Sequence, residues 1–251
     1  MANEFTNICK AIKGFVLTDK EDTREIFKAI KFEDNYAFAS DTTAAAMVKT
    51  HIPVEEAEMR NVKGDLVENL DPGYFPDFDK LINDRKYDNV EPAIVDFPKK
   101  IYKSYEWKHL FNFMKSAIYL PCKRMVFEKR GRNLLAYAVN ESIKVKAVLA
   151  TDVVGGEDIS FAVNAKYLSA TAELLDFLKC DKCQLFYTND VSHMIFRGYL
   201  KEELMCTIIV APIRVSNRDT DELWKFRNSD ITTDSKSCTT DDEEWDFLEE
   251  E

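Results

Sequence analysis

The residue types that most often carry catalysis or bind metals are few in this sequence and lie apart. The chain holds three histidines, His51, His109 and His193, and none has a cysteine or carboxylate at metal-ligand spacing. Cys180 and Cys183 form one C-x-x-C pair, but a structural zinc site needs a second pair, which the sequence lacks. Because this pair falls where a predicted helix turns into a strand, two half-buried thiols are the favoured interpretation.

Motifs for nucleotide binding and hydrolysis are also missing. Gly155-Gly156 is predicted to form a turn, because no G-x-x-x-x-G-K-[ST] pattern surrounds it. The sequence contains no G-x-S-x-G and no H-E-x-x-H. We therefore expect no catalytic residues, no metal and no cofactor, and an enzyme is the weakest of the alternatives.

Length and composition point to a folded protein. The 251 residues are 45% apolar and 31% charged, with only 7 glycines, which suits one large domain or two ordinary ones. No stretch approaches the roughly 20 uncharged apolar residues of a membrane span, and the first residues do not resemble a secretion signal. Six cysteines scattered through such a chain are typical of a reducing compartment, so a cytoplasmic location is predicted.

Acidic charge is concentrated at the C-terminal end. The formal net charge is −11, and residues 216–251 alone hold 13 acidic and 4 basic residues, leaving 30 basic and 32 acidic elsewhere. The body is thus almost neutral, and the whole-chain charge does not exclude a polyanionic partner. We predict that 216–251 is a mobile, disordered acidic tail, either a solubilising appendage or, through Trp245, Phe247 and Leu248, a short docking peptide.

One pattern of secondary structure recurs along residues 1–215: a short helix followed by two or three strands. These elements must position the residues of any site. Helices are predicted by apolar spacing at Glu4–Gly14, Tyr105–Ile118 and Ala165 to about Lys179. Strands are predicted at Arg24–Glu33, Tyr36–Ser40, Ala44–His51, Lys99–Lys103, Arg124–Lys129, Leu134–Val139, Ile143–Leu149, Ile159–Val163, Gln184–Thr188, Met194–Tyr199 and Met205–Pro212. Pro53–Pro98, between the first two copies, is predicted to be irregular.

Three copies of one unit predict an α+β protein built from repeated β-α-β-β-β units. The predicted divisions are 1–98, a shortened domain with a connector, 99–215, a complete domain, and the tail 216–251.

The last unit resembles a known family. Phe161 to Leu168 reads F-A-V-N-A-K-Y-L, Phe186 to Asp190 reads F-Y-T-N-D, and Ile208 to Val215 reads I-I-V-A-P-I-R-V. These segments are similar, in order and spacing, to the final domain of bacterial DNA polymerase III beta subunits, the DNA sliding clamps. Tyr74 to Ile82, with its F-P-D-F core, resembles the family segment that joins the middle domain to the last one.

The sequence also departs from that family. Thr42 to Ala45 stand where the family has Gly-His-Arg-Leu, the first domain is absent, and the middle domain has lost its second half. Three units remain where a bacterial protomer has six, which predicts a shortened relative, and a phage origin is part of this prediction. The resemblance implies a DNA-clamp fold with helices on one, channel-side face and antiparallel sheets on the other.

Two sites follow from the resemblance. Helices would face duplex DNA without reading its sequence, through the polar residues Lys10, Lys13, Lys108, Asn112, Lys115 and Lys166. A solvated helix face is the alternative for these residues. A hydrophobic pocket for peptides of the polymerase and clamp loader would be formed by Ser40, Thr42, Thr43, Pro76, Lys80, Leu81, Ile209, Val210, Ala211, Pro212, Ile213 and Arg214.

The sequence therefore predicts a non-enzymatic processivity factor that encircles DNA as a trimeric or tetrameric ring of identical chains. The alternative is a clamp-derived interaction protein that binds replication proteins without encircling DNA. The Trp245–Leu248 segment could occupy the pocket of its own or a neighbouring chain.

Overall fold

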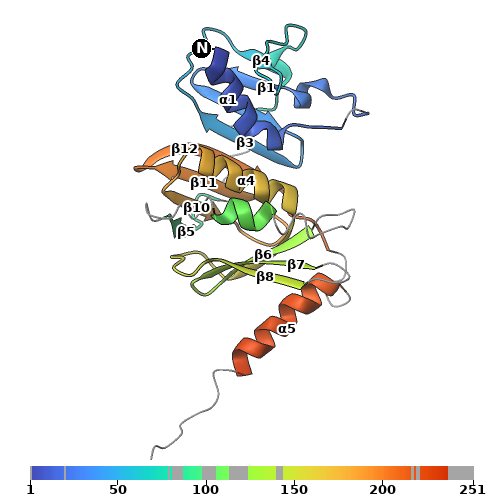
Figure 1. The fold of residues 1–251 in the computed structure, drawn as a ribbon, viewed down its shortest axis with the longest axis vertical. Helices are drawn as coiled ribbons and strands as arrows, with labels where there is room; N and C mark the ends of the chain where they lie inside the picture. Colours follow the sequence, from blue (N-terminus) through green and yellow to red (C-terminus); the bar gives the residue numbers. More distant parts are fainter. Residues whose placement is uncertain are drawn as a thin grey trace, which may run out of the picture.

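The computed structural model describes residues 2–19, 21–78, 80, 87–97, 106–112, 124–139, 144–215, 218 and 221–236. Residues 106–112 are helical, and the other helices are α1 (Ala2–Ile12), α4 (Ala165–Phe177) and α5 (Glu222–Lys236). Three short 3-10 turns are η1 (Lys13–Phe15), η2 (Glu25–Lys28) and η3 (Pro72–Tyr74). Figure 1 shows the helices and strands in sequence colours.

The strands form two antiparallel sheets. Their bounds are β1 (Ile30–Glu33), β2 (Tyr36–Ser40), β3 (Ala44–Lys49), β4 (Glu58–Arg60), β5 (Ala93–Asp96), β6 (Arg124–Arg130), β7 (Asn133–Val139), β8 (Lys144–Ala150), β9 (Ile159–Asn164), β10 (Lys182–Phe186), β11 (Met194–Leu200) and β12 (Glu203–Val210). The eight-stranded sheet has the order β4-β1-β2-β3-β12-β11-β10-β5, and the four-stranded sheet has the order β8-β7-β6-β9.

A helix followed by three strands occurs three times, which confirms the predicted α+β class and the repeat. α1 precedes β1–β3, the helix at 106–112 precedes β6–β8, and α4 precedes β10–β12. The predicted strand from Arg24 begins late, at Ile30, because η2 takes up its first half. There the Asp22 carboxylate accepts hydrogen bonds from the backbone N–H and the guanidinium of Arg24, which holds the chain in a turn.

The strands that precede the helices of the second and third units each pair outside their own unit. β5 pairs with β10, and β9 pairs with β6, so the second and third units exchange their first strands and form one interlocked domain. β4 follows β3 and pairs with β1 of the first unit. The prediction that Pro53–Pro98 is irregular is therefore wrong at β4 and β5. The predicted strand Lys99–Lys103 lies outside the described residues. Both observed strands are short and pair far along the chain, so local patterning does not reveal them.

A seam joins the first unit to the third. β3 and β12 run antiparallel, with Ala44 opposite Val210 and Val48 opposite Cys206. Because both are the third strand of their unit, this seam joins equivalent edges and makes one sheet from two units.

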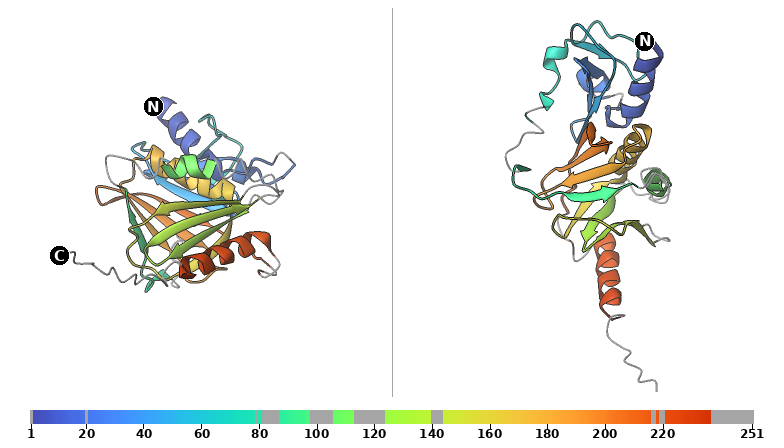
Figure 2. Two further views of the ribbon diagram at one scale, coloured as in Figure 1. Left: turned by 60° about the horizontal axis from the view of Figure 1, so that its bottom comes forward. Right: turned by 90° about the vertical axis from the view of Figure 1, so that its left-hand side faces the viewer.

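The helices of the three units cover one face of the sheets, as predicted. In the right-hand view of Figure 2, α1, α4 and the helix at 106–112 lie on one side, with the sheets on the other. The main core lies between these helices and the sheets and contains Phe15, Trp107 and Phe196. Gly14, just after α1, is needed for this packing, because an added Cβ would come 2.6 Å from the Cβ of Ala170 in α4.

The prediction of a disordered tail from residue 216 is wrong for residues 222–236, which form α5. This helix packs on the outer face of the four-stranded sheet, the face away from the helix layer (Figure 2, left-hand view). Leu223 and Trp224 are buried there against Tyr137 and Val126. The sequence signal was misleading because α5 has only a few apolar residues at one end and docks mainly through charged ones. Residues 237–251 lie outside the described part of the chain.

Candidate functional site

The helix layer is the first candidate site, and α4 lies at its centre. Asn164 caps this helix, because its side-chain oxygen accepts a hydrogen bond from the Lys166 N–H at 2.9 Å. On one side Ser169 Oγ donates to Asn112 Oδ1 at 2.7 Å. On the other side α4 contacts α1. The three helices therefore form one continuous surface.

Three of the six predicted DNA-contacting side chains already have partners within the chain. Lys166 Nζ lies 3.0 Å from Asp41 Oδ2, and Lys108 Nζ lies 3.5 Å from Asp176 Oδ2. Asn112 Nδ2 donates to Glu173 Oε1 at 3.3 Å.

Lys10 and Lys13 are exposed on α1 and η1, whereas Lys115 lies outside the described residues. Along α4 the side chains that are not buried are Lys166, Glu173 and Phe177, and together they add no net positive charge. The exposed positive charge of the described helix layer is therefore concentrated at α1 and η1.

Asp41 is the buried acid beneath this surface. It is 5% exposed and also accepts a hydrogen bond from the Tyr167 hydroxyl at 2.8 Å. Burial, with the charge of Asp41, raises the pKa of Tyr167 well above its usual value, so this hydroxyl stays protonated and donates. The Asp41 carboxylate therefore fixes Lys166 to the start of the first-unit turn and stabilises the contact between units.

The second candidate site lies on the opposite face of the eight-stranded sheet, over the seam between β3 and β12. The chain that leads from η3 to β5, called the connector here (described residues 72–78, 80 and 87–92), crosses the seam at this place. Phe78 is 4% exposed and packs with Tyr87 onto Ala45 of β3 and Ile209 of β12. The Tyr87 hydroxyl donates to the carbonyl of His193 at 2.6 Å, which ties the connector to the third unit. The chain's own aromatic residues thus cover the centre of the seam.

The structure brings some of the predicted pocket residues together. Ala211 N–H donates to the Thr43 carbonyl at 3.0 Å, directly beyond the pair formed by Val210 and Ala44. Ile209 faces the connector from the same end of β12. Pro212 follows Ala211 and is half-buried, whereas Pro76 lines a separate cavity with Phe75 and Phe78.

Other predicted pocket residues have structural roles or lie elsewhere. Ser40 is buried, donates to the Ala44 carbonyl and accepts from the Thr42 N–H, so it shapes the turn in which Thr42 has a φ of 74°. Val210 is fully buried in the main core. Ile213 packs on the four-stranded sheet, where its N–H donates to Ala162.

The two basic residues of the predicted pocket lie at the protein surface. Arg214 is exposed, and Lys80 is exposed with Nζ 3.0 Å from Asp77. Leu81 lies outside the described residues.

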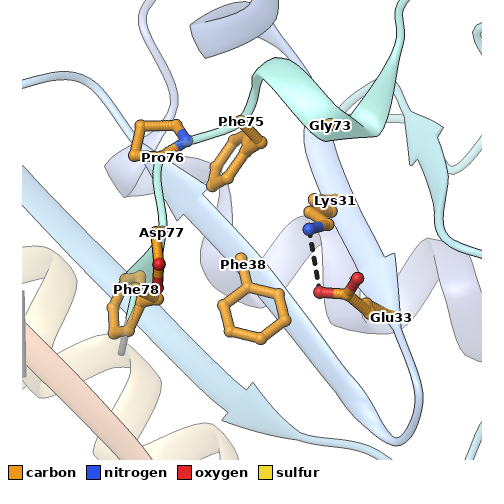
Figure 3. Close-up of a pocket in the computed structure, with 8 residues that line it drawn as sticks. All are labelled: Lys31, Glu33, Phe38, Gly73, Phe75, Pro76, Asp77 and Phe78. Carbon is orange, nitrogen blue, oxygen red and sulfur yellow. Dashed lines mark ion pairs between the residues drawn. The ribbon is translucent and has the colours of Figure 1, made fainter. Parts of the chain in front are cut away.

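The open cavity beside the connector is displaced from the predicted pocket. It has a volume of about 240 Å³ and lies over β1 and β2 (Figure 3). Phe38, Phe75 and Phe78 point into it, with Pro76 at one end, and a Lys31–Glu33 ion pair at 2.8 Å forms the opposite wall.

Lys31, Glu33, Phe38 and Phe75 of this cavity were not among the residues predicted for the pocket. The alternation of side chains along the strands could have indicated Lys31 and Phe38, because they are cross-strand partners in β1 and β2 and lie on the same face of the sheet.

The fold matches solved DNA sliding clamps. The DNA polymerase III beta subunit from Pseudomonas aeruginosa aligns with a TM-score of 0.62 at 11% identity, over 85% of this chain and 65% of that one. The sliding clamp from Bacillus subtilis aligns at 0.62 and 16% identity, over 85% and 63%. The beta chain from Streptococcus pneumoniae aligns at 0.63 and 13% identity, over 85% and 63%.

These comparisons confirm the resemblance seen in the sequence and show that the chain has the sliding-clamp fold. The chain spans somewhat less than two thirds of each of these clamps. No model of a protein family matches the sequence, and no curated protein matches it. A phage origin stays a prediction.

Two further findings concern the described residues alone. They contain no helix long and apolar enough to cross a membrane. They also contain no group of three or more histidine, cysteine or acidic residues arranged to hold a metal ion.

Proposed function

We propose that this protein is a non-enzymatic, sliding-clamp-like processivity factor that holds duplex DNA and tethers replication proteins. The observation that carries the proposal is the arrangement of three β-α-β-β-β units, with their helices in one layer and a sheet continuous across the seam. The solved proteins with this arrangement are described as sliding clamps and DNA polymerase III beta subunits.

DNA would lie against the helix layer. Sliding requires attraction to phosphates without tight, fixed contacts, and a layer whose positive charge is sparse suits that requirement. Lys10 and Lys13, exposed on the first unit, are the side chains best placed to contact phosphates. The paired Lys108 and Lys166 would contribute less, because each already faces a carboxylate.

The experiment is a salt titration of the binding of a short fluorescent duplex, followed by anisotropy. We expect sequence-independent binding at low salt, and a roughly tenfold weaker affinity for K10E/K13E. K201E is the matched control, because Lys201 is also exposed but lies in the turn between β11 and β12. Absence of binding at low salt, or equal loss in both variants, would contradict a DNA surface on α1.

A replication partner would dock a short peptide beside the connector. The cavity next to Phe75 and Phe78 offers aromatic walls and one ion pair, which suits an apolar side chain flanked by a charge. The predicted pocket at Thr43, Ile209 and Ala211 lies across Phe78, so movement of the connector would join the two spaces.

A second function is favoured by one specific observation, the pairing of Lys108 and Lys166 with acids of the same chain. A clamp-derived protein that binds replication proteins without encircling DNA would need no free positive charge in the helix layer. The anisotropy titration separates the two functions, because this alternative predicts no duplex affinity for the wild-type chain.

A further inference from the structure

The residues that hold α5 on the four-stranded sheet recur near the C-terminal end of the sequence. Asp221 to Asp230 reads D-E-L-W-K-F-R-N-S-D, and Asp242 to Glu251 reads D-E-E-W-D-F-L-E-E-E. Asp, Glu, Trp and Phe stand at the same positions in both segments, and both segments have an acid at the last position. The chain has only 3 tryptophans, so most of its tryptophan lies within this pattern. Residues 221–230 are called the α5 anchor below, and residues 242–251 the tail copy.

The recurring residues include those that contact the sheet in the α5 anchor. The Asp221 carboxylate accepts a hydrogen bond from the guanidinium of Arg124 in β6 at 2.6 Å. Trp224 is 2% exposed, in the apolar cluster between α5 and the sheet. The Phe226 ring packs edge-on against Tyr137 of β7, with 5.8 Å between the ring centres. The pattern therefore repeats the side chains that dock the helix, which are more specific than residues that merely favour a helix.

The acid at the last position of the pattern also docks. The Asp230 carboxylate accepts a hydrogen bond from Lys146 of β8 at 2.9 Å. Glu251 supplies a carboxylate at the equivalent position of the tail copy. Lys225 is exposed, so Asp246 at the equivalent position would not disturb docking on the sheet. Four of the docking positions of α5 are thus matched in the tail copy.

Two mismatches favour the α5 anchor over the tail copy. Leu223 is 6% exposed, and Glu244 in its place would bury a carboxylate. Arg227 pairs with the buried Glu128, and Leu248 in its place would remove that cationic partner. The α5 anchor also closes a shorter loop, which favours it roughly tenfold. The α5 anchor is therefore the stronger of the two competitors for the sheet.

We propose that the tail copy is a second occupant of the sheet face beneath α5, and that it docks there when α5 is released. The apolar part of this face belongs to β6, β7 and β9, and it holds one anchor at a time because both would use the same side chains. At about 3.3 Å per extended residue, residues 216–241 can span about 80 Å, well beyond the ~22 Å length of α5. Release of α5 would then leave the apolar face covered. The inference places the docking peptide here and not at the predicted pocket, and it holds whether or not the protein binds DNA.

The first test exchanges the residues that distinguish the two anchors. In the full chain, L223E/R227L/E244L/L248R gives the tail copy the leucine and the arginine, and gives the α5 anchor the glutamate and the leucine. The composition and net charge stay those of the wild type, so general effects of charge are controlled. We expect the tail copy to replace α5 on the sheet in this exchanged variant.

The measurement is fluorine NMR of chains labelled with fluorotryptophan, in which the solvent isotope shift reports the exposure of each ring. In the wild type, Trp224 should be shielded and Trp245 exposed, and in the exchanged variant most chains should show the reverse. Trp107, 2% exposed in the main core, should stay shielded in both and reports an intact fold. An exposed Trp245 in an exchanged variant whose Trp107 is shielded would overturn the proposal.

A second test uses the natural residues of the tail copy. A labelled peptide of residues 242–251 is titrated, followed by anisotropy, into the wild type and into L223E/R227L/W245A/F247A, a full chain in which both anchors are weakened. We expect the variant to bind the peptide roughly tenfold more tightly, because α5 no longer occupies the face. A peptide with alanine at both aromatic positions has the same charge and is the matched control. Equal affinity of the peptide for the two chains, or equal affinity of the control peptide, would overturn the proposal.

Discussion

The two outer sheet faces are covered in different ways. Over the eight-stranded sheet, the connector places Phe78 and Tyr87 on Ala45 and Ile209, an almost wholly apolar contact. Over the four-stranded sheet, α5 is held by buried charges as well as by Trp224.

The charged network under α5 is extensive. Arg227 pairs with Glu128, which is 1% exposed, and with Ser160. Asp230 accepts hydrogen bonds from Tyr137 at 2.8 Å and from Lys146 at 2.9 Å.

The difference implies two kinds of attachment. Apolar burial is insensitive to pH and is not weakened by screening, whereas ion pairs depend on ionisation and partly on salt. The connector is therefore expected to be a permanent part of the fold, and α5 an attachment that conditions can loosen.

The largest expected effect is on the connector side. Phe78→Ala removes a buried ring and should lower the free energy of unfolding by about 3 kcal/mol, measured by urea denaturation. Phe177→Ala is the matched control, because Phe177 is 43% exposed and its replacement should lower the free energy of unfolding only slightly. Equal losses in the two variants would show that the connector is not anchored through Phe78.

A smaller effect is expected from Arg227→Ala. Glu128 would lose one cationic partner in a buried site, and α5 should detach, because detachment rehydrates Glu128. We expect a loss of about 2 kcal/mol in α5 docking, followed by protease cleavage between residues 215 and 222.

The control for this variant is E128Q/R227A, in which the buried charge is gone and part of the docking should return. Raising salt should promote cleavage at the same place in the wild type but leave the connector intact. If cleavage depends on neither the Arg227→Ala substitution nor the salt concentration, α5 is not held on the sheet by electrostatic interactions.

Acid should loosen α5 before the connector. Burial raises the pKa of Asp230, but hydrogen bonds from Lys146, Tyr137 and Arg130 outweigh it, and the net pKa is lowered. Because the pKa of Asp230 is lower in the folded protein than in the unfolded chain, its ionised carboxylate adds stability at pH values above the unfolded-state pKa of about 3.9. This stability is lost as the pH falls through the folded-state pKa.

The measurement is the emission of Trp224 in a chain with the other two tryptophans replaced by phenylalanine. It should shift to the red below about pH 4, and D230N should show no such acid step. An identical step in D230N would assign the transition to other carboxyls.

Much of the fold could be predicted from the sequence, because the units are local. Apolar spacing in α1 and α4 and strand alternation in β6 and β11 each lie within a short stretch of chain. The short strands β4 and β5 could not be predicted, and the partner of β5, β10, lies far along the sequence.

The candidate sites were predicted less completely. The resemblance identified Thr43, Ile209 and Ala211, which the structure brings together at the seam. It could not reveal that Phe78 covers that seam, or that Asp41 and Asp176 pair with the predicted DNA-contacting lysines. Ion pairs between units depend on the packing of helices from separate regions, and no local pattern encodes them.

The smallest effect on stability is expected from removing residues 237–251, just beyond the described end of α5. The free energy of unfolding and the Trp224 emission should not change, because α5 keeps all its contacts. If Trp245, Phe247 and Leu248 act as a docking peptide for the connector surface, the shortened chain should bind an added peptide of residues 241–251 more tightly than the full chain does, since the tethered copy no longer competes. A scrambled peptide of the same composition is the control for charge alone. Equal affinity in the two chains would mean that the segment does not dock at the connector and that the connector surface is kept for a different partner.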